Sequence, residues 1–187
     1  MIQLNLFQIN FGDSPSPLPV NPSDECYTPE FWLQKIRQVF GGSIGLDPCT
    51  TANNRTHAEF FYTKESSGLI NSWNVPSTTK SVFLNPPYSK SGGKGNQELF
   101  LTKFWEEFQS EAFTEAITLT LIGTLCNKGT GSVLDRADAL AFPGRINFVD
   151  AENRPIGSGN RHDLVFAYYG PDRDRFGEIF SDSCYVR

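Results

Sequence analysis

The sequence predicts a single-domain α/β fold, in which a mostly parallel sheet is covered by helices on both faces. The chain has 187 residues, of which 39% are hydrophobic and 16 are Phe, enough to bury the core of one domain. Segments with helical spacing alternate with short apolar runs, which is the pattern of an α/β sheet. Polar residues follow two of these runs, and such sheets bind ligands beyond the carboxyl ends of their strands.

The N-terminal residues 1–24 are expected to form an extended arm, and residues 25–187 the folded domain. Proline alternates with polar residues in this arm, at Pro15, Pro17, Pro19 and Pro22, a pattern that builds no packed element. No apolar stretch is long enough to span a membrane. The first ten residues carry no Lys or Arg, which argues against a secretory signal. We therefore expect a cytoplasmic protein.

The first helix is predicted to begin at Thr28-Pro29-Glu30 and to end before Gly41-Gly42. Thr28 suits a helix cap, and Pro suits the first helical position because its missing N–H would have no partner there. Apolar residues then follow at helical spacing, at Trp32, Ile36, Val39 and Phe40. A short strand is predicted next, over 43–47, ending at Asp47-Pro48.

Further elements follow in the same alternation. A strand is predicted over 81–84, a flexible glycine loop over 92–95, and a helix over 96–111 whose Phe100, Phe104 and Phe108 form one core-facing stripe. Later strands are predicted over 116–123, 145–149 and 163–169.

Cysteine spacing and charge limit the possible partners. The four cysteines are far apart and only two histidines accompany them, so we expect neither a disulfide framework nor a metal site. The net charge is -5, but residues 26–105 carry eight Lys or Arg against five acids. A phosphate-facing surface is therefore sought in this middle segment, although charge alone equally suits a solvated surface.

The run Asn85-Pro86-Pro87-Tyr88 directly follows the predicted strand 81–84 and is the most informative motif. A strand-terminating turn is the structural alternative. The chemical interpretation starts from Pro86, which forces Asn85 out of the helical region, while two prolines stiffen the turn. If the Asn85 side-chain oxygen and the Pro86 carbonyl accept both protons of a planar exocyclic amine, the nitrogen lone pair becomes available to an electrophile. Tyr88 offers a flat face on which an extruded base stacks.

This motif resembles the signature of amino-methyltransferases. Together with Thr28-Pro29-Glu30 and Leu46-Asp47-Pro48-Cys49, it resembles the phage-encoded Dam family of adenine-N6 DNA methyltransferases. Two further similarities are Gly68-Leu69 ahead of Trp73, and Gly144-Arg145-Ile146 ahead of Phe148. The resemblance covers about residues 24–170.

The resemblance implies a Rossmann-like fold, S-adenosylmethionine as the methyl donor, adenine in DNA as the acceptor, and a phage or prophage gene expressed in a bacterial cytoplasm. By match of motif, Asn85, Pro86, Pro87 and Tyr88 form the catalytic set. Two groups of residues would bind the cofactor, namely Tyr27, Thr28 and Pro29 at its methionine end, and Asp47, Pro48 and Cys49 in the turn after the first strand.

The turn after Asp47-Pro48 departs from the general methyltransferase pattern. That pattern places glycines there so that the backbone approaches the cofactor closely, whereas this chain reads Cys49-Thr50-Thr51-Ala52-Asn53. The missing glycines leave open a degenerate DNA-binding relic of the fold. An amino-methyltransferase of RNA or of a protein amide is the second alternative.

Four basic residues are candidates for DNA contacts. Lys90 and Lys94 lie on the loop after Tyr88, and Arg154 and Arg161 lie on a later glycine-containing segment. A solvated loop is the equal alternative for these residues.

Overall fold

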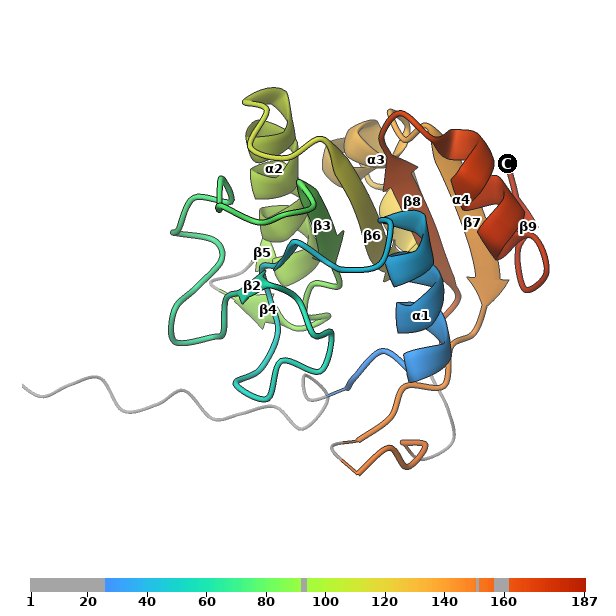
Figure 1. Cartoon of the computed structure of the whole chain (residues 1–187), viewed down its shortest axis with the longest axis horizontal. Coiled ribbons are helices and arrows are strands. Elements are labelled where there is room, and N and C mark those ends of the chain that lie inside the picture. Colours follow the sequence, from blue (N-terminus) through green and yellow to red (C-terminus); the bar gives the residue numbers. More distant parts are fainter. Residues whose placement is uncertain (1–25, 92–93, 151, 157–161) are drawn as a thin grey trace, which may run out of the picture.

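The computed structural model describes residues 26–91, 94–150, 152–156 and 162–187 (Figure 1). The expected arm, residues 1–24, lies outside the described residues. Within the described part of the chain, no helix is long and apolar enough to cross a membrane.

A seven-stranded sheet with the order β2-β1-β3-β6-β8-β7-β9 forms the centre of the molecule. Its first half is parallel and comprises β2 (Phe60–Phe61), β1 (Leu46–Asp47), β3 (Ser81–Leu84) and β6 (Glu115–Leu121). Its second half is antiparallel and comprises β8 (Leu164–Tyr169), β7 (Ala139–Gly144) and β9 (Tyr185–Val186). The predicted α/β fold is confirmed. The parallel strands form the half of the sheet that carries Asp47 and Asn85 at its strand ends.

Two helices cover each face of the sheet (Figure 1). On one face, α1 (Glu30–Val39) and α4 (Arg173–Phe180) pack against the buried strand side chains that point to that face, such as Phe83 and Phe166. On the other face, α2 (Asn96–Gln109) and α3 (Lys128–Leu134) pack against the alternate side chains, such as Val82 and Val165. Every strand residue from Leu164 to Tyr169 is buried, as expected for a strand covered on both sides.

The start of α1 differs from the prediction. The helix begins at Glu30, Pro29 is its N-cap residue, and no side chain caps it. The carbonyl oxygen of Pro29 accepts the first helical hydrogen bonds, from the N–H groups of Trp32 and Leu33. The expected cap by Thr28 is therefore wrong, because its hydroxyl is bonded to Asn85 instead. The predicted end is confirmed, since the Gly42 N–H closes the helix on the Arg37 carbonyl.

One predicted strand is wrong. The segment 145–149 forms no strand; β7 lies just before it and ends at Gly144, whose positive φ of 72° turns the chain. Ile146 and Phe148 are nevertheless buried, so their alternation reflects packing of a loop against the core. Val149 forms only an isolated bridge with Tyr27 and another with Pro155.

Candidate active site

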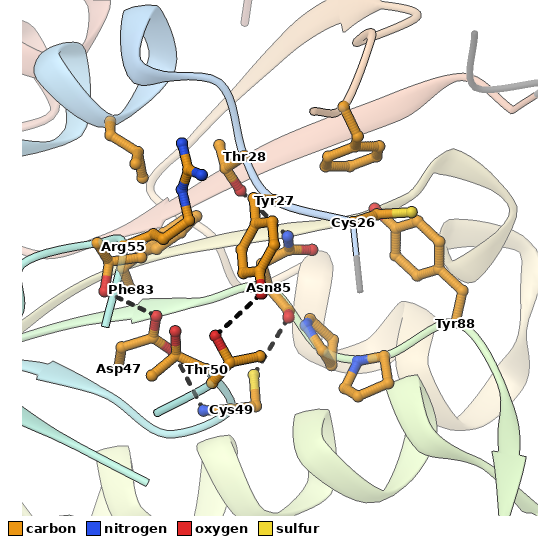
Figure 2. Close-up of a pocket in the computed structure, with 16 residues that line it drawn as sticks. Cys26, Tyr27, Thr28, Asp47, Cys49, Thr50, Arg55, Phe83, Asn85 and Tyr88 are labelled. Carbon is orange, nitrogen blue, oxygen red and sulfur yellow. Dashed lines mark hydrogen bonds between the residues drawn. The ribbon is translucent and has the colours of Figure 1, made fainter. Parts of the chain in front are cut away.

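A pocket of about 640 Å³, including the solvent at its mouth, opens beyond the carboxyl ends of β1 and β3 (Figure 2). It brings together both predicted cofactor groups, except Pro29 and Pro48, and the whole Asn-Pro-Pro-Tyr motif. The lining residues are Cys26, Tyr27, Thr28, Leu33, Asp47, Cys49, Thr50, Thr51, Arg55, Thr56, Phe83, Asn85, Pro86, Pro87, Tyr88 and Phe148.

Asn85 directly follows β3, and one end of its side-chain amide is hydrogen-bonded to Thr28. Its amide nitrogen Nδ2 donates a hydrogen bond to Oγ1 of Thr28, at 3.1 Å. Its amide oxygen Oδ1 is buried and has no hydrogen-bond partner. A buried acceptor without a partner is rare in folded proteins and costs free energy, so its presence in a pocket marks a position for a donor group of a ligand.

The main chain of Asn85 is held from a second side. The thiol Sγ of Cys49 donates to the Asn85 carbonyl oxygen, at 3.1 Å. Burial, and next the nearby charge of Asp47, raise the pKa of Cys49 well above its ordinary value. The thiol therefore keeps its proton and remains a donor, which links the turn after β1 to the motif after β3.

Asp47 is the buried acid of the pocket, with only 4% of its surface exposed. Its Oδ1 accepts from the Cys49 N–H at 3.1 Å, and its Oδ2 accepts from the Thr56 hydroxyl at 2.9 Å. Burial raises the pKa of Asp47 from 3.8 to about 6, although these hydrogen bonds act in the opposite direction. The carboxylate thus organises the turn on which it lies and is charged near neutral pH.

The turn after Asp47 closes without glycine. Asn54 and His57 take the left-handed conformation, with φ of 42° and 53°, which Asn and His adopt more readily than most residues. The Asn54 side chain then accepts from the Ala58 N–H and donates to the Ala58 carbonyl. Polar side chains therefore provide the turn geometry that glycines provide elsewhere.

Gly68 and Trp73 support this turn from behind. A Cβ atom at Gly68 would lie 2.0 Å from the carbonyl oxygen of Pro48, so only glycine fits here. The Trp73 indole N–H donates to the Gly68 carbonyl at 2.7 Å, and the Trp73 ring is 1% exposed. Pro48 is itself buried beneath Gly68 and is not among the residues that line the pocket. Pro29 does not line the pocket either, as it begins α1.

Tyr27 forms one wall of the pocket. Its main chain pairs with Val149, through hydrogen bonds of 2.9 and 3.0 Å. The guanidinium of Arg55 lies over the Tyr27 ring, 5.0 Å from its centroid, and also donates to the Asp150 carbonyl. The Thr51 hydroxyl donates to the Tyr27 hydroxyl at 3.3 Å. Tyr27 is therefore fixed both by the turn after Asp47 and by the segment around Val149.

Tyr88 packs its ring against the wall of the pocket. The ring meets Phe148 edge to face, with centroids 6.0 Å apart, and its hydroxyl is buried without a partner. Burial raises the pKa of Tyr88 above its ordinary value, so the phenol stays neutral. The pocket thus holds two buried polar atoms without partners, the Asn85 Oδ1 and the Tyr88 hydroxyl.

Of the four basic residues predicted to contact DNA, Arg154 does not line this pocket. The backbones of Lys90 and Lys94 belong to a two-stranded ribbon, β4 (Lys90–Ser91) and β5 (Lys94–Gly95), just after Tyr88. Arg154 is exposed and forms ion pairs with Asp150 and Glu152. Arg161 lies outside the described residues. Their role in DNA binding stays a prediction.

Several pocket residues were missed in the sequence. The polar segment after Asp47 contains three of them, Thr50, Arg55 and Thr56. Its position just after a strand was a signal that could have identified these residues as part of the pocket. Cys26 and Phe83 carried no such signal. Across the described ranges, no group of three or more His, Cys, Asp or Glu is arranged to hold a metal ion.

Replacing Gly68 with Ala is expected to lower the free energy of unfolding by about 1–3 kcal/mol, because the new Cβ displaces the Pro48 main chain. Urea denaturation measures this loss. Gly123→Ala is the matched control, since a Cβ there meets no atom within 4 Å, and a change under about 0.5 kcal/mol is expected. Equal effects of the two variants would contradict the close approach.

The raised pKa of Asp47 gives a pH dependence of stability. Between about pH 4 and pH 6 the folded chain binds this proton more tightly than the unfolded chain, so stability falls as pH rises. Relative to Asp47→Asn, the wild-type chain is expected to lose about 2 kcal/mol of unfolding free energy over this window. Urea denaturation of both proteins at pH 4, 5, 6 and 7 measures the difference. A difference that does not vary with pH would contradict the raised pKa.

Comparison with known proteins shows the family to which this chain belongs. A search of curated proteins gave no match. One similar solved structure is described as a modification subunit of a type I restriction enzyme from Vibrio vulnificus YJ016, with 13% identity and a TM-score of 0.47. The similarity covers 81% of this chain and 46% of that chain, so this chain spans just under half of that subunit's length. The family model for DNA N-6-adenine-methyltransferase (Dam) matches residues 15–176, and the chain therefore belongs to the Dam family.

Proposed function

We propose that this protein transfers a methyl group from S-adenosylmethionine to the exocyclic N6 amine of an adenine in DNA. The observation that carries the proposal is the buried Oδ1 of Asn85, an acceptor without a partner in the pocket beyond β1 and β3. Membership of the Dam family supports adenine in DNA as the acceptor. Tyr88 beside Asn85 supplies an aromatic face for a base taken out of the stack.

Asn85 would act by accepting a hydrogen bond from the amine, which loses its proton only after the new N–C bond has formed. The N6 amine of adenine is planar because its lone pair is delocalised into the ring, which makes it a poor nucleophile. An N–H group that donates to Asn85 Oδ1 and another that donates to the Pro86 carbonyl would draw the nitrogen toward tetrahedral geometry. Pro86 and Pro87 have no N–H, so neither proline competes as a donor at this point.

The pocket fits the cofactor through its donor and acceptor set. Asp47 would accept hydrogen bonds from a hydroxyl or ammonium group, since each carboxylate oxygen has a second lone pair beyond the bonds it already accepts. Tyr27 and Thr28 line the same pocket and would hold the methionine end of the cofactor. Cys49 lines the pocket on the side of the turn after β1 and would contact the cofactor there. When bound, S-adenosylmethionine supplies an electrophilic methyl group. The protein's contribution is to hold the amine in line with it.

The direct test is transfer of labelled methyl from S-adenosylmethionine to unmethylated DNA, with the product nucleosides separated. N6-methyladenine as the labelled nucleoside is the expected result. Label on RNA or on a protein amide, with none on DNA, would move the acceptor to another class. Absence of cofactor binding, measured by calorimetry, would identify the chain as a relic of the fold.

Asn85→Ala is expected to keep cofactor binding and to slow methyl transfer by about 10²- to 10³-fold, because the acceptor for the amine proton is removed. Calorimetry with S-adenosylmethionine and single-turnover transfer measure the two effects separately. Asn74→Ala is the control, since Asn74 is exposed and its side chain accepts only a long 3.4 Å bond from Lys80. Unchanged transfer in Asn85→Ala would refute the proposed role.

A further inference from the structure

We propose that Arg55 binds the carboxylate group of S-adenosylmethionine. The inference rests on the proposed function, because it takes this cofactor as the ligand of the pocket and names the residue that recognises its anionic group. Arg55 lines the pocket but has no part in the cofactor contacts described above. The contact is measured by ligand binding and does not require methyl transfer.

The charges of the pocket suit a ligand that carries charges of both signs. Among the described residues that line it, Arg55 is the only Lys or Arg, and Asp47 is the only Asp or Glu. S-adenosylmethionine has a sulfonium, an ammonium and one carboxylate. The permanent positive charge of a guanidinium repels the first two groups and attracts the third. On charge alone, Arg55 therefore has one suitable partner in the cofactor.

Arg55 lies at the part of the pocket proposed for the methionine end of the cofactor. Its guanidinium lies over the ring of Tyr27, 5.0 Å from the ring centroid (Figure 2). Tyr27 is one of the two residues that would hold the methionine end, and the carboxylate belongs to that end. The cation and its proposed partner are therefore expected on the same side of the pocket.

The guanidinium is held in place by the segment that follows Val149. Its Nη1 donates to the main-chain carbonyl of Asp150 at 3.2 Å, and its Nη2 donates to the side-chain oxygen of Asn153. Both acceptors are neutral, so these bonds fix the side chain without cancelling its charge. The Asp150 carboxylate is itself paired with Arg154. A side chain that is already ordered loses less conformational entropy when a ligand binds.

The chemistry of a guanidinium restricts which ligand group Arg55 binds. Its contact with Tyr27 uses the flat face, while its five N–H groups lie in the plane and serve several acceptors at once. All five are donors, so the group accepts no hydrogen bond from an ammonium or a hydroxyl. Bonds to a charged acceptor are about twice as strong as bonds to a neutral one, which favours the carboxylate over the oxygens and nitrogens of the adenosine part.

The experiment compares three ligands by calorimetry on the wild-type chain and on Arg55→Gln. S-adenosylmethionine and S-adenosylhomocysteine both have the carboxylate, and the second lacks the methyl group and with it the sulfonium charge. Decarboxylated S-adenosylmethionine keeps the sulfonium and the ammonium and lacks only the carboxylate. Arg55→Gln is expected to bind the two carboxylate ligands about 10- to 100-fold more weakly, because a charge-assisted hydrogen bond is lost. Its affinity for the decarboxylated ligand is expected to stay within about threefold of the wild-type value.

Arg136→Gln is the matched control. The Arg136 guanidinium also lies over an aromatic ring, that of Trp105 at 4.7 Å, but Arg136 is exposed and does not line the pocket. This variant is expected to bind all three ligands as the wild type does. An equal loss for all three ligands in Arg55→Gln would mean that Arg55 only supports the pocket wall, and would overturn the proposal. Unchanged affinities for all three, with weaker binding of DNA, would assign the charge to a phosphate and overturn it as well.

The same measurements separate this inference from the proposed function. A wild-type chain that binds none of the three ligands would refute both the cofactor and the role of Arg55. A wild-type chain that methylates DNA, with a loss in Arg55→Gln that does not depend on the carboxylate, would refute the role of Arg55 alone. A loss specific to the carboxylate ligands in a chain that methylates no DNA would refute the methyl transfer and leave the contact of Arg55 with the carboxylate established.

Discussion

The parallel pairing of β1 with β3, in register at Leu46 and Val82, is the constraint on which the pocket depends. Both strands end at the same edge of the sheet, so Asp47 and Asn85 lie on neighbouring strand ends although 38 positions separate them in the sequence. The Cys49 thiol then joins the two turns by donating to the Asn85 carbonyl. Tyr27 and Thr28 close the site from the segment before α1, and their position depends in turn on the pairing with Val149.

The pocket also collects the features that cost stability. Asp47 is a buried acid with a raised pKa, and Asn54 and His57, in the turn that follows it, adopt a left-handed backbone without lining the pocket themselves. The Asn85 Oδ1 and the Tyr88 hydroxyl are buried without partners. Each feature alone is unfavourable. Gln97 Nε2 and Thr118 Oγ1 are also buried without partners, but they do not line the pocket; the buried acid and the unpartnered acceptor within one pocket are typical of a site shaped for a ligand. The core beneath supplies the compensating burial, through fully buried rings such as Phe104, Phe166 and Phe176.

Local sequence signals predicted the elements that have strong signals of their own. The helices α1 and α2 and the strands β3, β6 and β8 were found within a few residues, because apolar spacing and flanking Pro or Gly defined them. The short helix α3 was missed because it contains two glycines and depends on packing against α2. The helix α4 was missed although Asp172 caps it and Phe176 and Phe180 follow at helical spacing, a signal that was available. The strand predicted over 145–149 was wrong because buried alternation occurs in packed loops as well.

The sequence by itself determined the fold class, the Asn-Pro-Pro-Tyr motif and its place after a strand, because these follow from short-range patterns in the chain. It also indicated Asp47 as the polar residue at the end of the first strand. Only the tertiary structure decided what each side chain does. Pro48 and Pro29 build the turn and the helix rather than the pocket, while Thr56 bonds Asp47 and Thr28 bonds Asn85. Such pairings join residues up to 57 positions apart. These pairings form because sheet register and helix packing bring the strand ends together. No local pattern in the sequence shows which distant residues will meet.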